Sequence, residues 1–68
     1  MRISKEKIEL LQARKGLGVL ELAELAGVSR QNISIIKNRG TCMPKTAARI
    51  AAGLGVDVTE ILEEVPKQ

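Results

Sequence analysis

The tripeptide Arg30–Gln31–Asn32, directly after Ser29, has the greatest hydrogen-bonding capacity in the chain. Guanidinium and carboxamide groups present donors and acceptors in planar arrangements, which suits bidentate recognition of a partner rather than nucleophilic attack. Residue types that catalysis commonly uses are scarce, since the sequence holds no histidine and only one cysteine, Cys42. A zinc site needs about four ligands, which these residues do not supply. The sequence therefore predicts a binding protein with no catalytic residue, no metal and no cofactor.

Length and composition predict one small cytoplasmic domain, residues 1–68. A chain of this size buries only about 60% of its unfolded surface, and a lone cysteine cannot form an intrachain disulfide. Self-association is therefore an expected source of stability. We find no signal peptide and no apolar run of about 18 residues, so the sequence predicts neither export nor a membrane span. A lone thiol is typical of a reducing compartment.

Positive charge is concentrated in the middle of the chain, although the net charge is only +3. Every charged residue between Glu24 and Asp57 is basic, and the segment from Asp57 onwards is acidic overall. This distribution indicates a polyanionic partner. Single-strand binders commonly stack bases on aromatic side chains, and the sequence contains none. A nucleic-acid partner is therefore expected to be a duplex.

Apolar residues recur with a period near 3.6, which predicts an all-α domain of five short helices. The expected helices cover about 5–15 between Ser4 and Gly16, 19–26, 30–38, a stretch from Pro44 to about 54, and a short last one containing Ile61 and Leu62. Ser4, Ser29 and either Asp57 or Thr59 are expected N-caps. Gly53 and Gly55 are expected to weaken and then end the fourth helix.

Residues 19–38, VLELAELAGVSRQNISIIKN, satisfy the requirements of a helix-turn-helix. Gly27 permits a positive φ in the turn, and Ala23 is small where two helices must cross closely. If Ile33 and Ile36 face the core, a rotation of about 100° per residue points Gln31, Ser34, Ile35 and Asn38 outward, with Arg30 on the flank. The polar tripeptide then lies on the first turn of the second helix of the motif.

The words LELAELAGVSRQNIS and PKTAARIAAGLGVDVTEIL resemble the Cro/repressor type of helix-turn-helix, also called XRE-like, over residues 17–62. The resemblance implies a lambda-repressor-like fold and sequence-specific binding of double-stranded DNA. Members commonly bind a palindromic operator as homodimers and commonly repress transcription. By position, the resemblance implies base contacts from Arg30, Gln31, Ser34 and Ile35. It implies contacts to the DNA backbone from Ser29, Asn32, Lys37, Asn38, Arg39, Lys45 and Thr46.

Two positions depart from the family pattern. Members often begin the second helix with Ser or Thr followed by Gln, whereas this chain has Gly18 and Val19. Ile35 is an outward apolar residue where the family often has a polar or basic one. These departures keep open an alternative, namely an antitoxin-like or regulator-binding protein–protein interaction module with weak or no DNA binding.

The acidic tail, residues 63–68, is a candidate for a dimer contact. Ile61, Leu62 and Val65 place apolar side chains beside this polar end of the chain, and Ile3 is expected nearby. A small core with no disulfide or metal motivates the hypothesis that these residues form the dimer interface.

Overall fold

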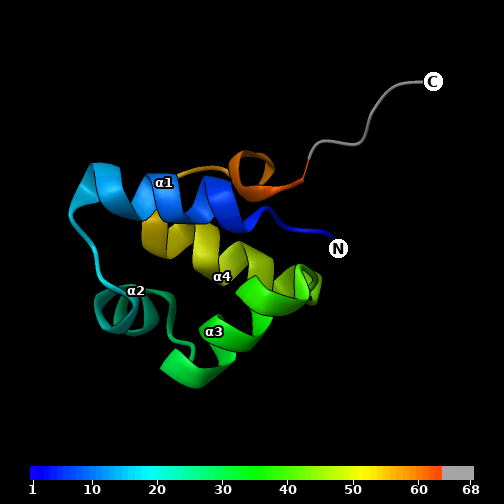
Figure 1. Ribbon diagram of the computed structural model, residues 1–68, viewed down its shortest axis with the longest axis horizontal. Coiled ribbons are helices and arrows are strands. Elements are labelled where there is room, and N and C mark those ends of the chain that lie inside the picture. Colours follow the sequence, from blue (N-terminus) through cyan, green and yellow to red (C-terminus); the bar gives the residue numbers. More distant parts are fainter. Residues whose placement is uncertain (64–68) are drawn as a thin grey trace.

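The computed structural model describes residues 1–63 and consists of four α-helices and one 3₁₀ turn (Figure 1). The elements in chain order are α1 (Lys5–Lys15), α2 (Val19–Ala26), α3 (Arg30–Arg39), α4 (Pro44–Leu54) and η1 (Val58–Ile61). The predicted all-α class is confirmed. The expected fifth helix is a single 3₁₀ turn, because the backbone becomes extended at Leu62.

Local signals set the ends of the helices. The Ser4 hydroxyl accepts a hydrogen bond from the Lys7 amide at 3.1 Å, and Ser29 caps α3 in the same way through the Asn32 amide. Helix α2 begins without a side-chain cap at Gly18, and the Glu21 carboxylate instead accepts from the Gly18 amide at 2.9 Å. Of the two expected caps for the last element, Asp57 is the one observed.

Asp57 accepts hydrogen bonds from both the hydroxyl and the amide of Thr59, at 2.6 and 3.1 Å. These bonds stabilise the carboxylate and hold the pKa of Asp57 below its ordinary value.

The core lies where α2 and α4 pack together, with α1, α3 and η1 covering its sides. Its largest fully buried side chains are Ile3, Ile8, Leu22, Ile33, Ile50, Leu54 and Ile61. Gly53 explains how α4 approaches α2 so closely. A β-carbon at Gly53 would lie 3.0 Å from the amide nitrogen and 3.2 Å from the Cα of Ala26. Helix propensity predicts that Gly53 weakens α4, whereas in the structure Gly53 permits the close packing of α4 on α2.

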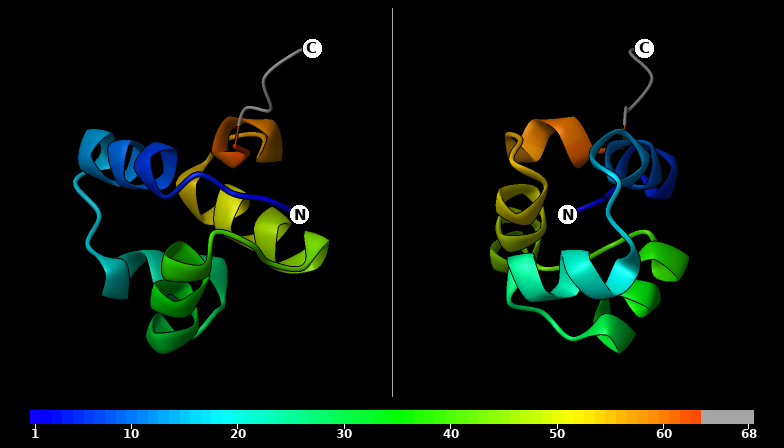
Figure 2. Two further views of the ribbon diagram at one scale, coloured as in Figure 1. Left: turned by 45° about the vertical axis from the view of Figure 1, so that its right-hand side comes forward. Right: turned by 90° about the vertical axis from the view of Figure 1, so that its left-hand side faces the viewer.

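The N-terminal segment, residues 1–4, pairs with two distant parts of the chain (Figure 2). The Ile3 amide donates to the Gly40 carbonyl at 3.0 Å, and the Ser4 amide donates to the Ile61 carbonyl at 2.7 Å. Isolated β-bridges join Arg2 to Thr41 and Ile3 to Leu62. This pairing closes the side of the core between the α3–α4 connection and the end of η1.

None of the helices described is both long enough and apolar enough to cross a membrane.

Candidate nucleic-acid interface

Helix α3 lies at the edge of the molecule opposite η1, and one of its faces is open (Figures 1 and 2). Ile33 and Ile36 are buried, whereas Arg30, Gln31, Ser34, Ile35 and Asn38 are exposed. The orientation predicted from the helical period is therefore confirmed. The turn before α3 also matches the prediction, since Gly27 has a φ of 69°.

The open face of α3 forms one side of a shallow depression of about 630 Å³. Its lining residues are Val19, Arg30, Gln31, Ser34 and Ile35. Within residues 1–63, no hydrogen bond or ion pair engages the side chain of Arg30 or Gln31. The structure thus brings together all four residues predicted to contact bases, and the two strongest hydrogen-bonding groups are available to a partner.

Val19 belongs to this surface although the sequence reading did not assign it there. From the sequence, Val19 only departs from the family pattern at the start of the second helix. The half-buried Val19 lines the same depression as Ile35, which is 50% exposed. The open face therefore has an apolar part as well as a polar part.

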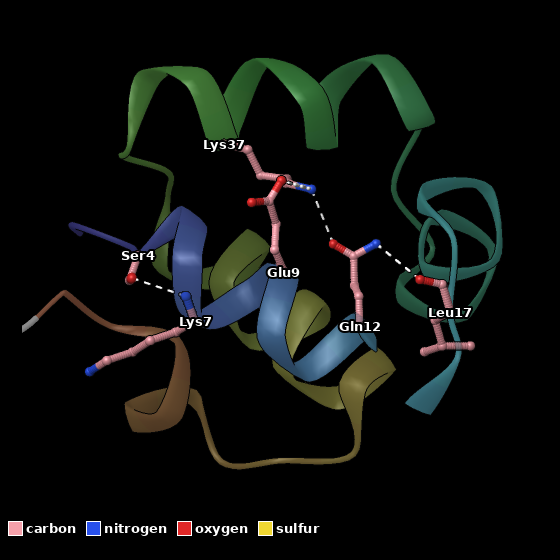
Figure 3. Close-up of polar contacts among 6 residues, drawn as sticks. All are labelled: Ser4, Lys7, Glu9, Gln12, Leu17 and Lys37. Atoms are coloured by element: carbon pink, nitrogen blue, oxygen red, sulfur yellow. Dashed lines mark hydrogen bonds and ion pairs between the residues drawn. The ribbon is translucent and has the colours of Figure 1, made fainter. Parts of the chain in front are cut away.

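Lys37 does not have the position that its prediction as a DNA-backbone contact requires. Its ammonium group donates to the Gln12 carboxamide oxygen at 3.1 Å and lies 3.4 Å from the Glu9 carboxylate (Figure 3). Only 13% of the Lys37 side chain is exposed. Helix α1 passes beside α3 and supplies these acceptors, which a projection of α3 alone could not reveal. We therefore remove Lys37 from the candidate interface.

The remaining candidates for contact with the DNA backbone lie at the ends of helices. Ser29 and Asn32 lie at the start of α3, and Asn38 and Arg39 are exposed in its last turn. Lys45 is exposed and Thr46 half-buried in the first turn of α4. Pro44, the first residue of α4, has no amide N–H, and Met43 provides no side-chain cap, so the Lys45 and Thr46 amides are open to an acceptor.

The candidate dimer residues separate in the structure. Ile61 is fully buried in the core, so its prediction as a dimer contact is wrong. Leu62 is half-buried and pairs with Ile3 of the same chain, and Ile3 is itself buried. Val65 lies outside the described residues, as does all of the acidic tail except Glu63.

Other chemistry has little basis in the described part of the chain. Residues 1–63 contain no group of three or more His, Cys, Asp or Glu side chains that could hold a metal ion. Cys42 is half-buried, and burial raises the pKa of its thiol, which disfavours the reactive thiolate.

Two crossed helices joined through Gly27, with the second exposed along one face, define a helix-turn-helix protein. A family model described as the Cro/C1-type HTH DNA-binding domain matches residues 7–67. The chain belongs to this family of DNA-binding domains. No curated protein and no solved structure matched the chain.

Proposed function

We propose that the protein is a cytoplasmic, non-enzymatic transcriptional repressor that binds a palindromic operator as a homodimer. In this proposal α3 enters the major groove of each half-site. The observation that carries the proposal is the open face of α3, where the side chains of Arg30 and Gln31 are exposed and have no partner within residues 1–63. Membership of the Cro/C1-type family supports DNA as the ligand.

Each residue on the open face has a distinct proposed role. The Arg30 guanidinium matches O6 and N7 of guanine, and the Gln31 carboxamide matches N6 and N7 of adenine. Ser34 can donate to or accept from a base edge, whereas Ile35 can only make an apolar contact with a thymine methyl group. Base selectivity is therefore assigned mainly to Arg30 and Gln31.

The proposed contacts with the DNA backbone come from both ends of α3 and from the start of α4. Arg39 and Lys45 supply positive charge, and Ser29, Asn32, Asn38 and Thr46 supply hydrogen-bonding groups. The open amides at the start of α4 add the positive end of the helix dipole, which favours a phosphate.

Selection of bound duplexes from a random pool, repeated with Gln31→Ala, tests the proposal. The wild type should select a palindromic consensus, and the variant should lose roughly 1–3 kcal/mol of discrimination at one position in each half-site. Arg14→Ala is the control, because Arg14 is an exposed, positively charged residue on the α1–η1 side of the molecule. It should leave the consensus unchanged. Recovery of no consensus by the wild type would refute the proposed function.

The apolar part of the open face favours a second candidate function, in which a protein partner covers Val19 and Ile35. Salt dependence separates the two functions. A protein that neutralises several DNA phosphates loses affinity steeply as salt rises, since condensed counterions are released on binding. Binding through an apolar protein interface does not require such a steep dependence.

A further inference from the structure

Gln12 is the only buried polar residue among those the structure describes, with 7% of its surface exposed. It projects from α1 into the space between α3 and the connection from α1 to α2 (Figure 3). A carboxamide buried at this place must have its donors and acceptor satisfied, or its desolvation would destabilise the fold.

Both ends of the Gln12 carboxamide are hydrogen-bonded, one to α3 and the other to the connection between α1 and α2. The oxygen accepts from the Lys37 ammonium group at 3.1 Å, and the nitrogen donates to the Leu17 carbonyl at 3.3 Å. These partners fix the orientation of the amide, because an ammonium group can only donate and a carbonyl can only accept. One side chain therefore connects α1 to α3 and to the segment that leads into α2.

The second acceptor for Lys37 is Glu9, whose carboxylate lies 3.4 Å from the ammonium group. Half of the Glu9 side chain is exposed, so solvent weakens this ion pair. The Gln12 bond is more sheltered, and hydrogen bonds to a charged group are the stronger kind. Because α1 packs mainly on α4 and η1, the contact of Gln12 and Glu9 with Lys37 is a principal link from α1 to the second half of α3.

We propose that Gln12 is a positioning residue for base recognition, acting through Lys37 on the orientation of α3. The inference rests on the proposed function, since it concerns how the open face is held against a duplex. Gln12 and Glu9 both engage the partly buried Lys37 ammonium group, so it is directed toward α1. Gln12 is uncharged, and Glu9 still pairs with Lys37 when Gln12 is replaced. Loss of the Gln12 bonds should therefore reduce the preference for the selected duplex and leave the general attraction to DNA unchanged.

Gln12→Leu tests this, because leucine retains apolar bulk and removes both hydrogen bonds. We expect affinity for the selected duplex to fall about tenfold. Affinity for a scrambled duplex and the slope of log affinity against log salt should not change. Lys37→Met should give the same pattern. The double exchange Gln12→Lys with Lys37→Gln keeps a donor facing an acceptor and should restore much of the preference.

Ile50→Val is the matched control for stability, since it trims a buried core side chain on α4 that lies outside this contact. It should lower the thermal midpoint without reducing the preference for the selected duplex. Undiminished preference in Gln12→Leu would overturn the inference. So would a salt slope that falls by about 0.9 in Lys37→Met, because that is the value of one phosphate contact.

Amide hydrogen exchange in the free protein keeps this inference distinguishable from the proposed function. If the wild type prefers no duplex, the proposed function fails, and the role of Gln12 in holding α3 is judged by exchange alone. Gln12→Leu should then speed exchange of the α3 amides relative to those of α4. Equal protection in the variant and the wild type would refute that role as well.

Discussion

Ile35 presents a half-exposed apolar side chain in the middle of a row of hydrogen-bonding groups. A side chain without donors or acceptors cannot distinguish bases by hydrogen bonds, and the one apolar feature of the major groove is the thymine methyl group. Val19, which lines the same depression, extends the apolar area beside it. At the scale of the residue, we therefore expect this surface to combine polar recognition with recognition of a methyl group.

Replacement of thymine by deoxyuridine, one position at a time in the selected duplex, should identify the base that contacts Ile35. Removing the methyl group should cost about 0.8 kcal/mol, or about fourfold in affinity, at one position per half-site. The same replacement should have a smaller effect on Ile35→Ala, which lacks the side-chain atoms beyond Cβ. Equal penalties in the two proteins would show that Ile35 does not contact the methyl group. Equilibrium titration of labelled duplexes measures all four combinations.

At the scale of the element, the pairing of α2 with α4 depends on a residue that helix propensity disfavours. Glycine costs a helix interior about 1 kcal/mol relative to alanine. At Gly53, however, the Ala26 backbone lies within 3.2 Å of the place where a β-carbon would be. Close packing of the two helices is therefore the effect that decides which residue fits.

Gly53→Ala should destabilise the protein by about 1–2 kcal/mol, because overpacking outweighs the gain in helix propensity. Urea unfolding followed by circular dichroism measures the change. Ala48→Gly, at an exposed position of the same helix, is the control. Its free energy of unfolding should fall by only about 1 kcal/mol, the difference in helix propensity. An increase in stability for Gly53→Ala would show that α2 and α4 do not approach as closely as described.

The helices could be predicted from the sequence because their signals are local. Serine caps, Gly16 and Gly27, and the apolar period lie within a few residues of the ends that they define. The open face of α3 followed from the positions of Ile33 and Ile36 for the same reason. These features were therefore accessible before any tertiary structure was known.

The features that the sequence did not reveal all depend on contacts between distant segments. The partial burial of Lys37 depends on the side chains of Gln12 and Glu9 from α1, and Gly53 is required where α2 and α4 pack closely. Ile3 is expected near Leu62 from the sequence, but their pairing within one chain involves backbone groups, which leave no pattern in so short a segment. The prediction of Ile61 as a dimer contact is wrong because the sequence does not distinguish an apolar residue that faces a partner from one that faces its own core.

At the scale of the whole molecule, Ile61 belongs to the fold of one chain. Ile61→Ala should therefore lower the free energy of unfolding by about 2–5 kcal/mol, as expected for a large buried aliphatic side chain. Denaturant unfolding at several protein concentrations gives the measurement. A change in the dissociation of a dimer, with no change in the stability of the monomer, would contradict the burial of this residue. Ile35→Ala is the control, since its side chain is half exposed and should affect stability much less.

The proposed homodimer makes a geometric prediction. Two α3 helices that bind one face of a duplex should be separated by one helical turn, about 34 Å. Insertion of about 5 base pairs between the half-sites should abolish tight binding, and insertion of about 10 should restore some of it. Gel-shift titration of the original duplex and of the two duplexes with insertions provides the test. Equal affinity for all three would indicate that each copy binds independently.

The pairing of residues 1–4 with residues 40–42 and 61–63 has a consequence for synthesis of the chain. Ile3 can pair with Leu62, and Ser4 with Ile61, only after Ile61 and Leu62 have been translated, which is almost sixty residues later. Residues 1–4 therefore cannot pair with residues 61–63 until the later segment has left the ribosome. The helix-turn-helix can form earlier, but the domain closes around it only after Leu62 has emerged.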